Sequence, residues 1–355
     1  MIPFVFFQKS VVFGQFSYNT CSSIDKRSAL MDSTSTKTTG AWDQYWQGDT
    51  LGHAYNRQGE SQPALQEFWL SQFNDLLKDR TELSMVDLAC GNGALTHLIH
   101  ELPYDGILAQ TCIDVSEAAL ANVQSQRPRV QTVQSDLQSI DLKAASFDLV
   151  VSQFGVEYAG SDAFLRAIEL VNNGGFAQFI IHHKGSVIEH ESQRNHDAVE
   201  AVINADFLGA TSSFMNSAFN ALKDPSFSKD PALLENKHHF KTALSKLENT
   251  LSTFGVEIAG GTLHKLYNDV ADILERLGQY DSAELHNWLD RMAHELVAYR
   301  ERMASMLNAA LSEADFTRLK QAIETNGFTI SSAGSLLDTE HNAPLAWALV
   351  AQKHA

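Results

Sequence analysis

Short apolar runs alternate with amphipathic segments between residues 83 and 183. Segments in which apolar residues recur at helical spacing, such as SEAALANVQSQ and SDAFLRAIELV, separate most of these runs. The alternation of short apolar strands with helices is typical of a parallel sheet that helices cover on both faces. The five strand-like runs are LSMVDL, ILAQTCID, RVQTVQSD, FDLVVSQF and FAQFIIHH.

The same alternation returns near the C-terminus. Ser312 and Asp315 form a capping box ahead of a helical run, and two further strand-like runs, FTISSAG and PLAWALVAQK, follow and predict a hairpin. We therefore expect an α/β fold, a Rossmann-like doubly wound sheet of seven strands that is mostly parallel, with the last strand antiparallel. Residues 41–184 and 311–355 supply this sheet domain.

Between these two blocks, residues 185–310 lack a convincing strand. Apolar residues recur at intervals of three and four over residues 240–254, 263–277 and 285–306, and glycines separate the first two seams. Three such seams predict an antiparallel helical bundle inserted between strand five and the last helix of the sheet domain. The insertion is expected to act either as a lid over the sheet domain or as an interface.

The N-terminal residues 1–40 do not join the sheet pattern. Residues 1–16 are apolar but are interrupted by Gln8 and Lys9, and the run is too short to span a membrane and poorly shaped as a signal peptide. The polar run that opens at Met31 predicts a disordered extension, and Met31 is an alternative start of the native protein. Whether residues 1–30 belong to the native protein stays open.

Composition and charge narrow the function classes. The chain has 355 residues, of which 44% are hydrophobic and 19% charged, with a formal net charge of −17. That charge argues against nucleic acid as a partner, because phosphate binding needs clustered Lys and Arg. The three cysteines, Cys21, Cys90 and Cys112, give neither a disulfide framework nor a zinc site. We expect a cytoplasmic protein without a membrane segment or a metal.

One stretch, MVDLACGNGALTHLI from Met85, carries the main chemical signal. An apolar strand leads into a turn that contains Gly91 and Gly93, and apolar residues then resume at helical spacing. Glycine is used where a backbone turns sharply or approaches a ligand closely. A dinucleotide site would need Gly or Ala at the position of Thr96, so the pattern argues against NAD.

Three acids stand where the first three predicted strands end. They are Asp87, Asp114 and Asp136. Carboxylates at the carboxyl edge of an open parallel sheet lie where such sheets bind ligands. Asp114 can accept both hydroxyls of a ribose, Asp136 can accept from an adenine amino group, and Asp87 can orient the turn or meet an ammonium group.

In order and spacing, these motifs resemble the class I S-adenosylmethionine-dependent methyltransferases. The resemblance runs through DLACGNG, CIDVS, QSDLQ, FDLVVSQFGVEYA and GGFAQFII, and covers about 180 residues in two blocks. It implies S-adenosyl-L-methionine as the cofactor. Ala89 stands where the family often has Gly, and Asn172-Asn173 replaces a usual proline before a turn.

The resemblance also implies a set of cofactor-binding residues. Amides around Ala89 and Gly91 would approach the methionine part, Asp114 would hold the ribose, and Asp136 would line the adenine edge. Ser152 and Gln153 would face the sulfonium side. The full set is Asp87, Ala89, Cys90, Gly91, Gly93, Asp114, Val115, Asp136, Leu137, Ser152 and Gln153.

No obligatory catalytic residue follows from this chemistry, because methyl transfer depends mainly on holding the acceptor at attack distance. His182 and His183 end strand five, on the acceptor side, and either can serve as a general base or as a polar wall. Tyr158 and Glu157 are comparable candidates. With His190 and His196 the two histidines suggest a cluster, but no carboxylate spacing or cysteine supports a metal site.

The predicted function is methyl transfer to a small-molecule acceptor (EC 2.1.1.-), because a lid over the acceptor side would define a small pocket. Two alternatives stay open. One is a protein or tRNA methyltransferase whose insertion recognises the macromolecule. The other is a non-catalytic cofactor-binding protein that uses the insertion as an interface, for instance in a homodimer. The sequence names neither the acceptor nor the methylated atom, whether N, O, S or C, nor the oligomeric state.

Overall fold

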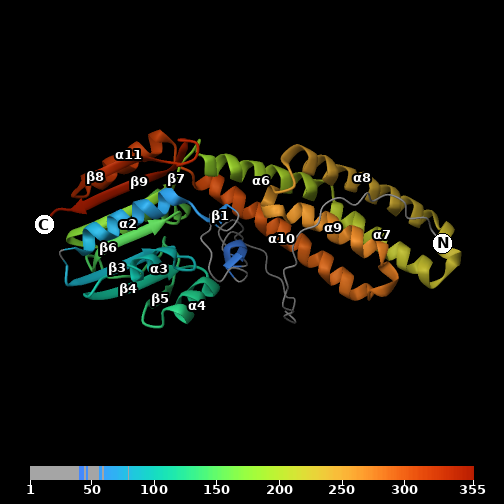
Figure 1. The fold of residues 1–355 in the computed structure, drawn as a ribbon, viewed down its shortest axis with the longest axis horizontal. Helices are drawn as coiled ribbons and strands as arrows, with labels where there is room; N and C mark the ends of the chain where they lie inside the picture. Colours follow the sequence, from blue (N-terminus) through green and yellow to red (C-terminus); the bar gives the residue numbers. More distant parts are fainter. Residues whose placement is uncertain (1–39, 44, 47–55, 58–59, 79) are drawn as a thin grey trace. The chain divides into compact units, whose positions relative to one another are not determined.

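The structure is a computed structural model that describes residues 40–43, 45–46, 56–57, 60–78 and 80–355 (Figure 1). The prediction of disorder for residues 1–40 falls almost wholly outside the described residues. The chain divides into two compact units, which we name the sheet unit and the helical unit. Among the described residues, the sheet unit comprises residues 40–197 and 297–355, and the helical unit comprises residues 198–296.

A seven-stranded sheet forms the centre of the sheet unit. Its strand order is β5-β4-β3-β6-β7-β9-β8, and β9 runs antiparallel to both of its neighbours while the other pairs are parallel. The predicted seven-stranded, mostly parallel sheet with an antiparallel last strand is therefore confirmed. The strands are β3 (Glu82–Leu88), β4 (Ile107–Asp114), β5 (Gln131–Gln134), β6 (Phe147–Gln153), β7 (Val171–His182), β8 (Phe328–Leu337) and β9 (Pro344–Lys353), and a separate two-stranded sheet joins β1 (Asn56–Arg57) to β2 (Glu60–Ser61).

The start of β7 differs from the expected one. The pattern predicts a turn over residues 172–175 and a strand from Phe176, whereas β7 already begins at Val171. The pairing with β6 shifts register between Val171 and Phe176, and Gly174 has φ of 73°. The glycines therefore make a bulge within the strand rather than a turn before it.

Helices cover both faces of the sheet. On one face, α2 and α3 pack against the buried side chains of Met85, Leu149 and Ile180. On the other face, α5 and α11 pack against those of Phe179 and Leu349, and Figure 1 shows α11 beside β8. The bounds of these helices and of α4 are α2 (Pro63–Leu77), α3 (Ala94–His100), α4 (Glu117–Gln126), α5 (Ser161–Glu169) and α11 (Glu313–Thr325).

The predicted capping box of α11 is confirmed, and two other helices also begin at residues that favour a helix start. Pro63 opens α2, where a missing backbone N–H costs nothing. Ser312 and Asp315 form the predicted capping box at the start of α11. Ser116 caps α4, because its side chain accepts a hydrogen bond from the backbone N–H of Ala119.

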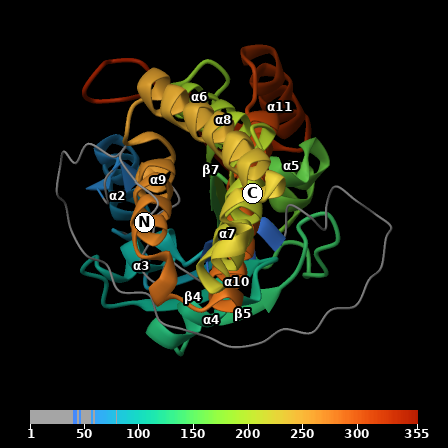
Figure 2. The same ribbon diagram turned by 90° about the vertical axis from the view of Figure 1, so that its right-hand side faces the viewer.

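The predicted apolar seams lie on three helices, and their central residues, such as Leu247, Leu266 and Leu289, are buried. In the helical unit α7 and α8 pack side by side (Figure 2), while α6 and α10 extend across the boundary between the units. The helices are α6 (Val187–Asn204), α7 (Phe207–Lys223), α8 (Pro231–Phe254), α9 (Thr262–Glu275) and α10 (Ser282–Ala309), with short 3₁₀ turns η2 (Pro225–Lys229), η3 (Ile258–Gly261) and η4 (Leu277–Gln279).

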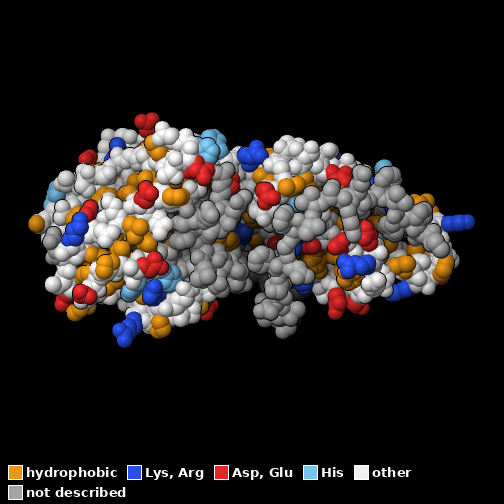
Figure 3. Space-filling view, viewed as in Figure 1, with side chains coloured by type: hydrophobic (Ala, Val, Ile, Leu, Met, Phe, Trp, Pro, Cys, Tyr) orange, Lys and Arg blue, Asp and Glu red, His pale blue; other side chains and the backbone are white. Residues whose placement is uncertain are grey.

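Lys and Arg side chains on the described part of the face drawn in Figure 3 stand scattered among Asp and Glu. In the part of the chain that the structure describes, no helix combines the length and the apolar character that crossing a bilayer requires.

Candidate functional site

The glycine turn between β3 and α3 has an unusual backbone. Ala89, Gly91 and Gly93 all have positive φ, at 51°, 51° and 79°. Glycine adopts this left-handed region readily, whereas the Cβ of Ala89 makes it costly there. Hydrogen bonds fix the turn: the N–H of Cys90 donates to the carbonyl of Ile113 at 3.0 Å, and that of Gly93 to the carbonyl of Cys90 at 2.9 Å.

Asp114, at the end of β4, joins the neighbouring strand to this turn. One carboxylate oxygen accepts from the backbone N–H of Gly91 at 2.8 Å, and the other accepts from that of Ser116 at 2.9 Å. The residue is only 7% exposed. Burial raises the pKa of its carboxyl group, hydrogen bonds from the backbone of Ser116, Gly91 and Val115 oppose that shift, and the charge of Asp43 adds to it.

Asp87 lies beneath the turn and is buried. Its carboxylate accepts a hydrogen bond from the hydroxyl of Thr96 at 3.1 Å, and that hydroxyl also lies 3.0 Å from Sγ of Cys112. Burial raises the pKa of Asp87 to about 7, the hydroxyl of Thr96 opposes this, and the charge of Asp114 adds to it. Thr96, which made a dinucleotide site unfavourable, is thus a partner of the first acid.

Asp136 follows β5 at the same edge of the sheet. Its carboxylate accepts from the backbone N–H of Gln138 at 2.8 Å, and the neighbouring Leu137 is buried. The carbonyl of Val115 accepts from the side chain of Gln134 at 3.0 Å. The three acids are therefore brought to one edge of the sheet, as the strand order requires.

Ser152 and Gln153, at the end of β6, form hydrogen bonds with other residues of the chain. The hydroxyl of Ser152 donates to the carbonyl of Leu88 at 2.8 Å, and Oε1 of Gln153 accepts from the indole N–H of Trp69 at 2.6 Å. These bonds tie β6 to β3 and to α2. A direct contact of either residue with a cofactor stays a prediction.

The segment after β6 lies close against the glycine turn at Gly155. A Cβ atom at this position would lie 2.6 Å from the Cβ of Ala89 and 2.7 Å from Oγ of Ser152. Such distances leave no room for a side chain. The short helix η1 (Val156–Ala159) follows directly, so its residues begin next to the turn.

Within η1, Glu157 pairs with His182 at the end of β7. One carboxylate oxygen lies 2.7 Å from Nδ1 of His182 and also accepts from the backbone N–H of that residue at 2.9 Å. The side chains are 2% and 3% exposed. The sequence named both residues separately as candidates, but it did not predict their pairing.

The other candidate histidines do not converge on this pair. The ring of His183 stacks on Trp347 with centroids 3.9 Å apart, and its Nδ1 lies 2.7 Å from the carbonyl of Lys184. His196 pairs with Asp197, and His190 is exposed. Among the described residues, no group of three or more His, Cys, Asp or Glu is placed to hold a metal ion.

A helical segment before β1, residues 41–43 and 45–46, reaches the same edge. Asp43 accepts from the hydroxyl of Ser116 at 2.7 Å and from the backbone N–H of Ala118 at 3.3 Å. The ring of Trp46 covers Gly91 so closely that a Cβ atom there would lie 2.6 Å from it. Trp42, Tyr45 and Trp46 stand at helical spacing in the sequence, which does not indicate where they pack.

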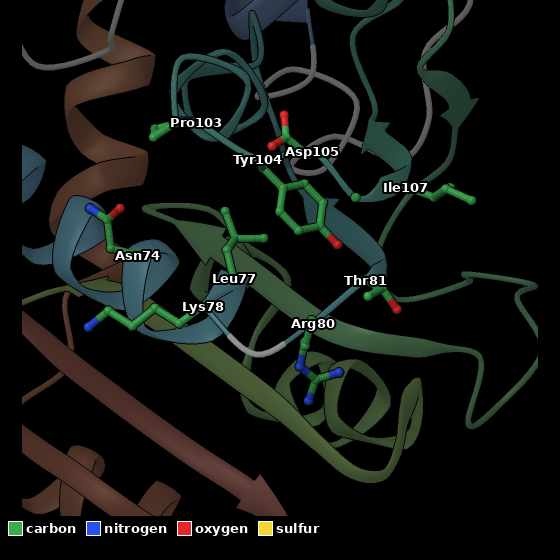
Figure 4. A pocket seen from close by; sticks show the side chains of 10 residues that line it. Asn74, Leu77, Lys78, Arg80, Thr81, Pro103, Tyr104, Asp105 and Ile107 are labelled. Carbon is green, nitrogen blue, oxygen red and sulfur yellow. The ribbon is translucent and has the colours of Figure 1, made fainter.

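A cavity of about 470 Å³ opens at the opposite edge, where β3 and β4 begin (Figure 4). The side chains of Lys78, Arg80 and Tyr104 lie around it. This edge is remote from the carboxyl ends at which the three acids gather. The lining residues are Asn74, Leu77, Lys78, Arg80, Thr81, Pro103, Tyr104, Asp105, Gly106 and Ile107.

The stretch of chain that holds the glycine turn is similar to a known family. A family model described as a methyltransferase domain matches residues 85–175, which run from the strand before the glycine turn into β7. The search of curated proteins found no match.

Solved structures to which the chain is similar include an S-adenosylmethionine-dependent methyltransferase from Mesorhizobium loti (26% identity, 32% of this chain and 53% of that one covered, TM-score 0.28). A second is phosphoethanolamine N-methyltransferase 1 from Haemonchus contortus (17% identity, 43% of this chain and 34% of that one covered, TM-score 0.33). A third, described as a possible exported protein from Bordetella parapertussis, is similar over 88% of this chain and 79% of that one (13% identity, TM-score 0.42). The chain spans about half the length of the first of these proteins.

Proposed function

Because the chain carries a class I, S-adenosylmethionine-dependent methyltransferase domain, we propose that it transfers the cofactor's methyl group to a small-molecule acceptor. The hydrogen bond between the N–H of Gly91 and the carboxylate of Asp114 carries the proposal. It fixes an acid at a strand end against a glycine turn, at the edge where open parallel sheets bind ligands.

The chemistry of Asp114 fits a ribose. An ionised carboxylate offers about four lone-pair positions, and the backbone N–H groups of Gly91 and Ser116 take two of them. The remaining positions can accept the two ribose hydroxyls. Burial strengthens such charge-assisted bonds, because water does not compete for the same oxygens.

The other contacts follow the strand ends. The turn of Ala89, Cys90, Gly91 and Gly93 would approach the methionine part, and Asp87 below it would meet the ammonium group. Val115, Asp136 and Leu137 would lie along the adenine, since they follow the next two strands of the sheet.

The bound cofactor would supply an electrophilic methyl group on a sulfonium. The protein's own contribution is to hold the acceptor in line with that methyl group and to keep water away. Well-oriented reactants gain effective molarities of about 10⁵–10⁸ M, so positioning alone supplies much of the rate. The segment after β6 lies against Ala89 at Gly155, so it is the element best placed to position the acceptor.

Calorimetry with the purified full chain tests cofactor identity. We expect binding of S-adenosylmethionine and of S-adenosylhomocysteine, and no heat with NAD, because Thr96 bonds to Asp87 where a dinucleotide site needs close helix packing. Binding of NAD without a response to either methionine-derived ligand would overturn the proposal.

A second experiment separates acceptor classes. Cell extract is divided by size and incubated with the protein and radiolabelled cofactor. Label in the small-molecule fraction supports the proposal. Label only in protein or RNA would favour a macromolecular acceptor, and cofactor binding without any transfer would favour a non-catalytic role.

A further inference from the structure

The Glu157–His182 pair stands beside the glycine turn. Glu157 belongs to η1, which follows β6, and His182 ends β7, the neighbouring strand. Gly155 lies against Ala89 of the turn, two residues before Glu157. The pair is therefore held close to the part of the site where the methionine end of the cofactor is proposed to lie.

The hydrogen-bond partners assign the protons of the pair. An ionised carboxylate only accepts hydrogen bonds, so Nδ1 of His182 carries the hydrogen that Glu157 accepts. In the neutral ring, Nε2 is then the basic nitrogen. Glu157 also accepts from the backbone N–H of His182, which fixes the ring in place, and its charge stabilises the imidazolium that forms when Nε2 takes a proton.

Two aromatic rings lie against His182 of the pair. The ring of Phe154 lies 4.5 Å from that of His182 between centroids, and the ring of Tyr158 lies 5.4 Å away. Trp42 extends the group, with its ring 5.7 Å from that of Tyr158. Aromatic faces attract cations, and a buried carboxylate among them attracts cations further.

The sign of this charge discriminates between acceptors. A hydroxyl arrives uncharged, so neither the carboxylate of Glu157 nor the aromatic rings attract it as they attract a cation. An amine arrives as a cation and leaves as a methylated cation, both of which Glu157 and the aromatic rings favour. We propose that the acceptor is an amine, bound beside Glu157, Tyr158 and Trp42 and deprotonated by His182. This inference rests on the proposed methyltransferase function.

The proposed reaction balances without another reactant. An ammonium proton passes to Nε2 of His182, which leaves a neutral amine with a free lone pair. The nitrogen lone pair then forms the N–C bond to the methyl group while the C–S bond breaks, and the electrons of that bond stay on sulfur. The product is a methylated ammonium ion, and His182 later releases its proton to water.

Binding of a charged probe and its neutral isostere tests the site without turnover. Choline and uncharged 3,3-dimethylbutan-1-ol have nearly the same shape, and each is titrated into the full chain saturated with S-adenosylhomocysteine. We expect choline to bind about tenfold more tightly than the alcohol, as a cation over aromatic rings should. Glu157→Gln and Tyr158→Leu should each remove most of that difference.

Tyr104→Leu is the matched control, because Tyr104 lies at the opposite edge of the same sheet unit. It should leave the choline preference unchanged, and S-adenosylhomocysteine affinity checks that each variant is folded. Equal binding of the two probes, or a choline preference that survives in Glu157→Gln and Tyr158→Leu, would overturn the amine assignment alone. Failure of the wild-type chain to bind S-adenosylhomocysteine would instead overturn the proposed function.

Discussion

The carboxylate of Asp114 connects the end of β4 to the glycine turn after β3. Asp114→Ala removes the partner of a buried N–H group at Gly91 together with the proposed acceptor of two ribose hydroxyls. We expect S-adenosylhomocysteine binding to weaken by about 1.5–3 kcal/mol, the usual cost of losing hydrogen bonds to a charged group. Calorimetry measures the change, and the thermal unfolding transition shows whether the variant is folded.

Asp136→Ala is the matched variant for that prediction. Asp136 is half-buried, and its proposed bond to the adenine amino group is a single contact. Its loss should cost about 0.5–1.5 kcal/mol. Equal or reversed effects in two folded variants would show that the roles assigned to Asp114 and Asp136 are wrong.

Asp87 should make stability depend on pH. Its pKa is raised from 3.8 to about 7 in the folded chain, so the folded state keeps a proton that the unfolded state has already lost. The stability that protonated Asp87 contributes is complete below about pH 4 and is lost as the pH rises toward 7. One pKa unit corresponds to about 1.4 kcal/mol, so the loss is on the order of 4 kcal/mol at most.

Asp87→Asn checks this effect, because asparagine resembles the protonated acid and still accepts from Thr96. Urea unfolding of both proteins between pH 4 and 8 gives the difference in their free energies of unfolding. The wild type should lose stability relative to Asp87→Asn as the pH rises toward 7. Parallel curves over that range would mean that Asp87 does not hold a proton there.

At the scale of elements, local sequence patterns predicted the strands and their succession along the chain. The runs that became β3, β4 and β6 are largely apolar and carry a polar residue at or next to their last position, so burial and edge position can both be read from them. The glycines at residues 174–175 were ambiguous, because glycine serves turns and bulges alike. Only the register of β7 against β6 shows that they form a bulge here.

Contacts between distant segments could not be predicted in the same way. Glu157 and His182 meet because β6 and β7 are neighbours in register, which spacing along the chain does not specify. Asp43 reaches Ser116 across 73 positions. The sequence signal for each was only a polar or aromatic residue near a strand or helix end.

The segment containing Asp43 and Trp46 should support the cofactor site through α4. Asp43 accepts from Ser116 and from the N–H of Ala118, in the first turn of that helix. Asp43→Ala should cost about 1 kcal/mol of stability, as the loss of a helix cap does. It should also weaken S-adenosylhomocysteine binding, because Trp46 then loses its fixed place against Gly91.

Asp230→Ala provides the control for the effect on binding. Asp230 caps α8 in the helical unit by accepting from the N–H of Ala232 at 2.9 Å. Its loss should lower the unfolding temperature similarly without changing cofactor affinity. If Asp43→Ala shifts only the unfolding temperature, the segment stabilises the fold and does not support the site.

At the scale of the whole molecule, the helical unit is predicted to act as a lid or as an interface. The lid hypothesis requires a hinge, and η3 is the candidate, since Ala259 and Gly260, with φ of 53° and 61°, break the helical backbone between α8 and α9. The interface hypothesis requires exposed apolar surface. Leu222, Phe227 and Leu234, where α7 leads into α8, are 55%, 44% and 61% exposed.

Hydrogen exchange and sedimentation decide between the two hypotheses. For a lid, which we expect, S-adenosylhomocysteine should slow amide exchange over residues 255–261 several-fold at any protein concentration, because closure orders such segments. Phe227→Ser and Leu234→Ser should then leave the sedimentation coefficient unchanged. For an interface, the same two substitutions should shift the protein toward the monomer with cofactor affinity intact. Protection that depends on protein concentration and not on the ligand would leave the lid without support.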